Sequence, residues 1–82
     1  MRVFQDETGE AWVASVRERA GDDYKGRYSF HMMPQSGSED EGVALTDVRW
    51  NSHETAERTL LTMSTQELRR RLSSARGRAL RA

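Results

Sequence analysis

Apolar and polar residues alternate in two segments of the first half of the chain, AWVASVRER (residues 11–19) and RYSFHMM (27–33). A period of two is typical of a β-strand, because successive side chains point to opposite faces of a sheet. The short segment RVFQD (2–6) precedes the glycine turn ETGE, and VALTDVRW (43–50) follows the polar loop PQSGSEDEG. We therefore expect four strands, the first two of which form a hairpin.

The spacing of apolar residues becomes helical after Trp50. Asn51 and Ser64 each precede a glutamate by three residues, which is the spacing of a capping box at a helix start. The segment from about Ser52 to Arg76 is therefore predicted to be helical, either as two helices or as one helix with a break near Met63. Four apolar residues share one face of its second part: Leu68, Leu72, Ala75 and Ala79.

These elements predict an α+β fold, in which a four-stranded, mainly antiparallel meander carries the helical segment on one face. Residues 1–82 are expected to form a single domain, since the chain is too short for two, with residues 77–82 as a basic tail that frays. Five side chains are expected in the core: Trp12, Phe30, Leu60, Leu68 and Leu72.

The sheet face away from the helices is the first candidate surface. If the alternation is assigned correctly, Val13 and Met33 lie on this face, together with Val3 and either Val43 or Leu45. Apolar side chains exposed on a sheet favour association with another chain. Val13 and Met33 are therefore candidate interface residues.

The composition points in the same direction, because only 35% of the residues are apolar. A chain of 82 residues with so few apolar side chains builds a small core, and a partner subunit can supply further burial. The sequence has no cysteine, which excludes disulfides and thiolate zinc sites and favours a cytoplasmic location. No apolar run approaches the length of a membrane span.

Charge is divided unevenly along a chain of zero net charge. Residues 1–41 carry five basic and nine acidic side chains, whereas residues 42–82 carry eight basic and four acidic ones. On a helical wheel, four arginines lie opposite the apolar stripe, while Arg69 and Arg76 flank it. The four opposite arginines are Arg70, Arg71, Arg78 and Arg81. They are candidate contacts for an anionic partner, although a solvated helix face is the simpler explanation. Glu67 is available to pair with Arg70 or Arg71.

Residues suited to catalysis are few. His31 and His53 are the only histidines, and the acidic pairs and runs lack the ligand spacing of a calcium loop. No nucleophile elbow and no phosphate-binding glycine loop occurs in the sequence. We therefore expect no enzyme activity, no metal site and no cofactor.

Two functions are consistent with these features. The first is a small non-enzymatic protein-interaction or accessory subunit, which forms a homodimer or docks on a protein partner. The alternative is a nucleic-acid-binding module that uses the arginine-rich C-terminal helix.

Overall fold

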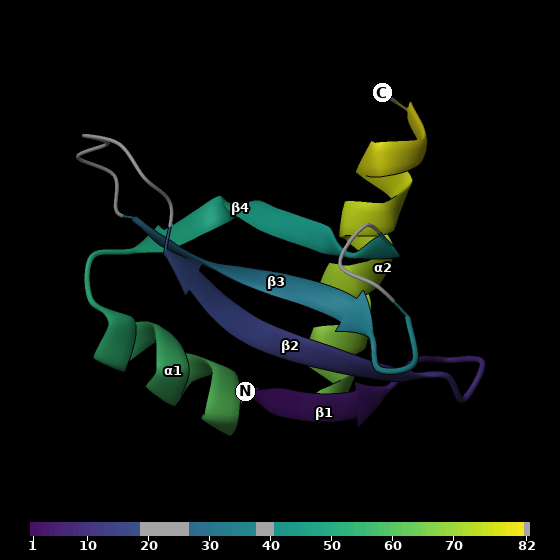
Figure 1. The fold of residues 1–82 in the computed structure, drawn as a ribbon, viewed down its shortest axis with the longest axis horizontal. Coiled ribbons are helices and arrows are strands. Elements are labelled where there is room, and N and C mark those ends of the chain that lie inside the picture. The colour runs from purple at the N-terminus through teal and green to yellow at the C-terminus, as the bar shows by residue number, and fades with distance from the viewer. Residues whose placement is uncertain (19–26, 38–40, 82) are drawn as a thin grey trace.

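The computed structural model describes residues 1–18, 27–37 and 41–81 and shows a four-stranded sheet followed by two helices (Figure 1). The elements are β1 (Arg2–Gln5), β2 (Ala11–Glu18), β3 (Tyr28–Pro34), β4 (Val43–Trp50), α1 (His53–Thr62) and α2 (Thr65–Arg81). The strands pair antiparallel in the order β1-β2-β3-β4. The predicted α+β meander is confirmed. Neither helix is long and apolar enough to cross a membrane within the described ranges.

The helical segment is two helices rather than one. Met63 ends α1 in an extended conformation with φ −69° and ψ 140°, and the hydroxyl of Ser64 then accepts a hydrogen bond of 3.1 Å from the backbone N–H of Glu67. This is the cap predicted for α2. The predicted cap of α1 is one residue too early, because the backbone N–H of Thr55 donates to Ser52 rather than to Asn51. The shorter hydroxyl side chain of Ser52 occupies the capping position.

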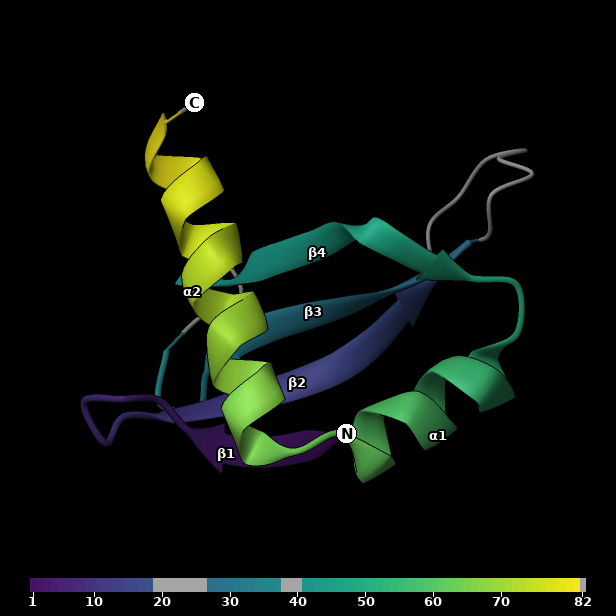
Figure 2. The ribbon, with the colours of Figure 1, turned by 180° about the vertical axis from the view of Figure 1, so that it is seen from behind.

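Both helices pack on the same face of the sheet. Figure 2 shows α2 crossing in front of the strands, whereas Figure 1 looks onto the face that carries no helix. All five side chains predicted for the core are buried. The core also includes Phe4, Ala14, Met32, Leu45, Ala56 and Ala75. At its edge, the ring of Trp50 stacks on that of Phe30 at a centroid distance of 4.4 Å.

An irregularity in β4 explains one wrong assignment in the sequence analysis. Tyr28 pairs with Trp50 and Phe30 pairs with Leu45, so residues 46–49 of β4 stand opposite one residue of β3. This bulge changes the side-chain parity, and both Leu45 and Trp50 turn toward the helices. Leu45 is buried in the core, and Val43 packs against it. Neither residue lies on the helix-free face, contrary to the prediction.

Arg2 connects the first strand to the corner between the helices. Its Nη1 donates to the carbonyl oxygens of Leu60 and Leu61, at 3.2 and 3.3 Å, and to that of Met63. Its Nη2 lies 3.4 Å from the hydroxyl of Thr65. The last carbonyls of a helix have no hydrogen-bond partner within the helix and carry a partial negative charge. A guanidinium at this end donates hydrogen bonds to the carbonyls and places a positive charge beside them. Arg2 thereby holds the end of α1 against β1.

Replacing Leu68 with Ala should destabilise the protein strongly. Leu68 is fully buried between α2 and the sheet. Truncating such a side chain removes apolar contact and leaves a cavity, at a cost of about 2 to 4 kcal/mol in the free energy of unfolding. Chemical denaturation followed by circular dichroism measures this loss.

Leu61→Ala is the matched control, because Leu61 is 57% exposed on α1. The substitution should change the free energy of unfolding by less than about 0.5 kcal/mol. Equal stabilities of the Leu68 and Leu61 variants would contradict the packing of α2 described above.

Candidate functional site

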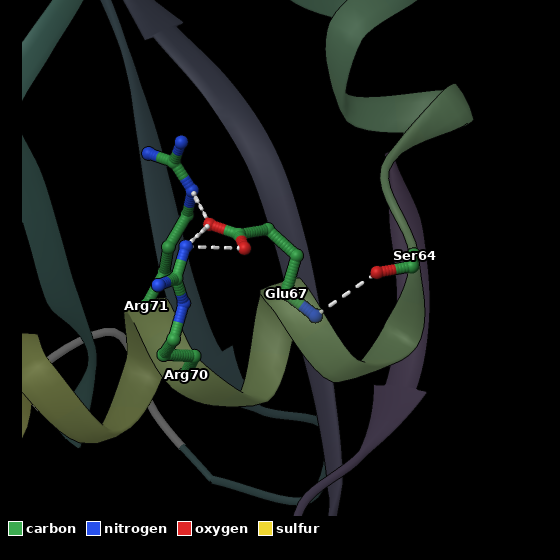
Figure 3. Close-up of polar contacts among 4 residues, drawn as sticks. All are labelled: Ser64, Glu67, Arg70 and Arg71. Carbon is green, nitrogen blue, oxygen red and sulfur yellow. Dashed lines mark hydrogen bonds and ion pairs between the residues drawn. The ribbon is translucent and has the colours of Figure 1, made fainter.

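The first two arginines of the predicted anion-binding set converge on one carboxylate, as Figure 3 shows. Nη2 of Arg70 lies 2.5 and 2.8 Å from the two carboxylate oxygens of Glu67, and Nε of Arg71 lies 2.9 Å from one of them. The spacings of three and four residues place these side chains side by side on the helix. The hydrogen bond from Arg70 is the main cause that lowers the pKa of Glu67 below its usual range. Two positive charges therefore share one negative charge.

The four predicted contact residues are placed only in part. The side chain of Arg70 is 77% exposed on α2, whereas that of Arg71 is only 29% exposed. Arg71 therefore lies beside the apolar stripe rather than opposite it, contrary to the prediction. The side chains of Arg78 and Arg81 lie outside the described residues. That these four arginines contact an anionic partner stays a prediction.

Two other arginines of α2, which the helical wheel places beside the apolar stripe, reach across to the first hairpin. Nε of Arg69 donates to the carbonyl oxygen of Gln5 at 2.7 Å. The guanidinium of Arg76 lies over the ring of Trp12, 5.4 Å from its centroid, and its Nη1 is 4.0 Å from a carboxylate oxygen of Asp6. Stacking on an indole face is favourable for a guanidinium. Both side chains are thereby held in place at the hairpin.

A groove of about 360 Å³ runs between the β1–β2 turn and α2. Its wall on the helix is formed by Arg69, Ser73 and Arg76, and its wall on the turn includes Asp6 and Thr8. This groove is not among the surfaces predicted from the sequence. The available signal was the spacing of seven residues between Arg69 and Arg76, which places two arginines on one side of a helix.

Asp6 organises the turn at one end of this groove. Its Oδ1 accepts hydrogen bonds from the backbone N–H of Thr8 at 2.9 Å, from the Thr8 hydroxyl at 2.7 Å and from the N–H of Glu10 at 3.0 Å. Its Oδ2 accepts from the indole N–H of Trp12 at 2.9 Å. Aspartate commonly binds its own backbone two residues on, which is the turn chemistry present here.

These hydrogen bonds favour the ionised form of Asp6. The bond from the Thr8 hydroxyl contributes most, the bonds from Trp12, Glu10 and the Thr8 amide add to it, and partial burial acts in the opposite direction. Together they lower the pKa of Asp6 from 3.8 to about 2. Gly9, at φ 90°, completes the turn in a backbone conformation that other residues rarely adopt.

The helix-free face of the sheet carries a continuous apolar row. Val3 pairs with Val13 across β1 and β2, and Val13 pairs with Met33 across β2 and β3. Val3 is 48% exposed, and the other two are partly exposed. The structure thus brings together Val13 and Met33, the two residues predicted for this face. That they form an interface stays a prediction.

A second row on the same face is polar or small and holds no permanent charge. Ser15 pairs with His31, and His31 pairs with Ala44 of β4. The imidazole of His31 lies close to Gly42, where an added Cβ would fall 2.6 Å from Cε1 of His31 and 3.0 Å from the carbonyl oxygen of Met32. Glycine at position 42 therefore leaves the space that the imidazole occupies.

The two histidines lie apart, in different elements. His53 begins α1, where its ring meets the edge of Tyr28 at 5.6 Å and its Nε2 lies 3.9 Å from Glu57. No group of three metal-ligating side chains gathers within the part of the chain that the structure describes.

The chain matches no known family model, no curated protein and no solved structure with significance. Its function must be inferred from the groove and the helix-free face.

The pKa of Asp6 predicts an acid-dependent loss of stability. Because folding lowers this pKa from 3.8 to about 2, the ionised carboxylate stabilises the folded state fully above about pH 4 and loses this effect as the pH falls through 2. Titration of the Asp6 carboxyl carbon by NMR should give a pKa near 2.

The variant Asp6→Asn should melt at a lower temperature at pH 7 and should show a smaller decline in melting temperature between pH 4 and 2. In asparagine, an N–H₂ group replaces one of the two carboxylate oxygens that accept hydrogen bonds in the turn, so at least one of the donors loses its acceptor. Glu7→Gln, which removes a neighbouring exposed carboxylate, should keep the decline of the unmodified protein. A steep decline in Asp6→Asn would assign the acid sensitivity to other groups.

Proposed function

We propose that this chain is a small non-catalytic interaction module that self-associates through the helix-free face of its sheet. The observation that carries the proposal is the row of Val3, Val13 and Met33, which is apolar, continuous across three strands and partly exposed. Burying such a row against a second apolar surface removes it from water, which is the main favourable term in protein association.

The two edges of the sheet are poorer sites for association than its face. β1 has only four residues, and Arg69 donates a hydrogen bond to the carbonyl oxygen of Gln5 at its end. β4 is longer, but the bulge at residues 46–49 interrupts its regular pairing. Short strands and bulges both reduce the ability of an edge to add a further strand. The face is therefore the more suitable surface for a partner.

A second copy of the chain fits this face best. The rows formed by Val3, Val13 and Met33 and by Ser15, His31 and Ala44 carry no permanent charge, whereas the next row of the same face holds Arg17 near the end of β2. Two copies that meet at the two uncharged rows around a two-fold axis can keep Arg17 at the rim of the contact, where water and salt screen the repulsion between like charges. With strands about 4.8 Å apart and about 3.3 Å per residue, the face measures roughly 400 Å². Two such faces together approach the lower limit of specific interfaces, about 1,000 Å² in total, which is typical of a weak dimer.

The alternative function, binding of nucleic acid by the arginine helix, receives less support. Arg70 and Arg71 already share the carboxylate of Glu67. A phosphate backbone would have to compete with these contacts within the chain. Affinity for nucleic acid depends mainly on the number of cations available to phosphates.

Analytical ultracentrifugation over a range of concentrations should detect a dimer with a dissociation constant in the micromolar range or weaker. Val13→Lys should shift this equilibrium to monomer, because it places a charge in the centre of both apposed rows. Circular dichroism should report a folded variant, since Val13 is only partly buried in the monomer.

Leu61→Lys is the control, because it adds the same charge at an exposed apolar residue of α1. It should dimerise as the unmodified protein does, and a change from 50 to 200 mM salt should leave the apolar dimer nearly unaffected. A monomer at millimolar concentration, or an equal loss of dimer in both lysine variants, would refute the proposal. Salt-sensitive retention of an oligonucleotide would instead favour the alternative.

A further inference from the structure

We propose that the groove between the β1–β2 turn and α2 binds an oxyanion of the phosphate monoester class between Arg69 and Arg76. This site lies on the helix-covered side of the molecule, so it does not depend on association through the opposite face of the sheet. Both guanidinium groups line one groove of about 360 Å³. A volume of this size accommodates a small ligand.

The spacing of the two arginines suits one anion held between them. Seven residues along a helix correspond to about two turns, or roughly 10 Å, and return the side chain to the same side. Ser73 lies between them, four residues after Arg69 and three before Arg76, and its exposed hydroxyl lines the same groove. Two long side chains that approach from both ends can therefore meet an anion above Ser73.

Arg76 is oriented for this role by its contacts with the first hairpin. Its guanidinium lies over Trp12, which is 3% exposed and therefore fixed in the core. Its Nη1 forms an ion pair with Oδ2 of Asp6 at 4.0 Å, a distance that is too long for a hydrogen bond. The indole thus positions the guanidinium, while its donors are not committed to Asp6.

Arg69 is held in a different way with a similar result. Only its Nε–H donates to the carbonyl oxygen of Gln5. Guanidinium groups have five N–H donors in a planar fork, so four donors on Nη1 and Nη2 remain for a ligand. Because the bond to Gln5 already restricts the side chain, less conformational entropy is lost when an anion binds.

The two carboxylates near the groove, Asp6 and Glu7, differ in how strongly they oppose the binding of an anion by the arginines. Asp6 accepts four hydrogen bonds from Thr8, Glu10 and Trp12, which disperse its negative charge into the turn. Glu7 is exposed on the opposite wall and opposes an incoming anion. A phosphate monoester offers a double negative charge and three acceptor oxygens, which match two forks and a hydroxyl better than a carboxylate with two oxygens.

The test is a titration of the ¹⁵N-labelled full chain with inorganic phosphate and glycerol phosphate, in a phosphate-free buffer at constant ionic strength. Acetate in the same buffer is the second arm, because it distinguishes phosphate from carboxylate recognition. We expect saturable shifts of the Nε–H resonances of Arg69 and Arg76 and of the Ser73 amide with both phosphates. The dissociation constant should be millimolar or tighter, and acetate should bind at least several-fold more weakly.

Substitutions in the groove should change the affinity in opposite directions. Arg76→Gln and Arg69→Gln should each weaken phosphate binding by about tenfold, since each removes charge-assisted hydrogen bonds. Glu7→Gln should strengthen it, because it removes the negative charge on the facing wall. Arg58→Gln is the matched control, since Arg58 pairs with Glu54 on the exposed side of α1 at 3.0 Å and lies outside the groove.

Arg69→Lys keeps the positive charge but lacks the fork, and it leaves the contact between Arg76 and Trp12 intact. It should weaken binding several-fold in a protein whose melting temperature is close to that of the unmodified chain. This variant decides the question if Arg76→Gln fails to fold. Shifts that do not saturate, an affinity unchanged in Arg69→Lys, or an equal loss in Arg58→Gln would overturn the proposal.

Discussion

The hydrogen bonds accepted by the Asp6 carboxylate are the interaction on which the first hairpin and the groove both depend. They fix the turn through Thr8 and Glu10 and hold the indole of Trp12 by its N–H. Trp12 thereby presents one ring face to the core and leaves room for Arg76 over its ring. A single carboxylate thus determines the register of β1 with β2, the position of a core aromatic side chain and the orientation of a surface arginine.

The sequence predicts the regular elements well, because their periodicity depends on residues that are close in the chain. Alternation identifies the strands, the Ser64 cap marks the start of α2, and the five predicted core residues are buried. The bulge in β4 is not visible in this pattern, since it depends on how the strand pairs with β3. Strict alternation therefore places Leu45 on the helix-free face, whereas the structure buries it in the core.

In the candidate site, contacts between residues close in the chain could likewise be predicted from the sequence, whereas contacts between distant residues could not. The pairing of Glu67 with Arg70 and Arg71 spans three and four residues and can be read from a helical wheel. The partners of Arg69 and Arg76 lie in the first hairpin, more than 60 residues away in the chain. Only the packing of α2 on the sheet brings them together. Cationic side chains held by distant partners cannot be distinguished in the sequence from those that pair locally.

The contact of Arg2 with the corner between the helices has a consequence for the order of events during synthesis. The four strands can pair once the chain is free to fold as far as Trp50, but the carbonyls that receive Arg2 belong to residues 60, 61 and 63. Until α1 and α2 follow, one face of the nascent sheet exposes Phe4, Trp12 and Phe30 to water. Such a surface is what chaperones and proteases recognise in incomplete chains. The helices in the last third of the chain therefore cover the apolar face of the sheet, and a chain that stops before them keeps this face exposed.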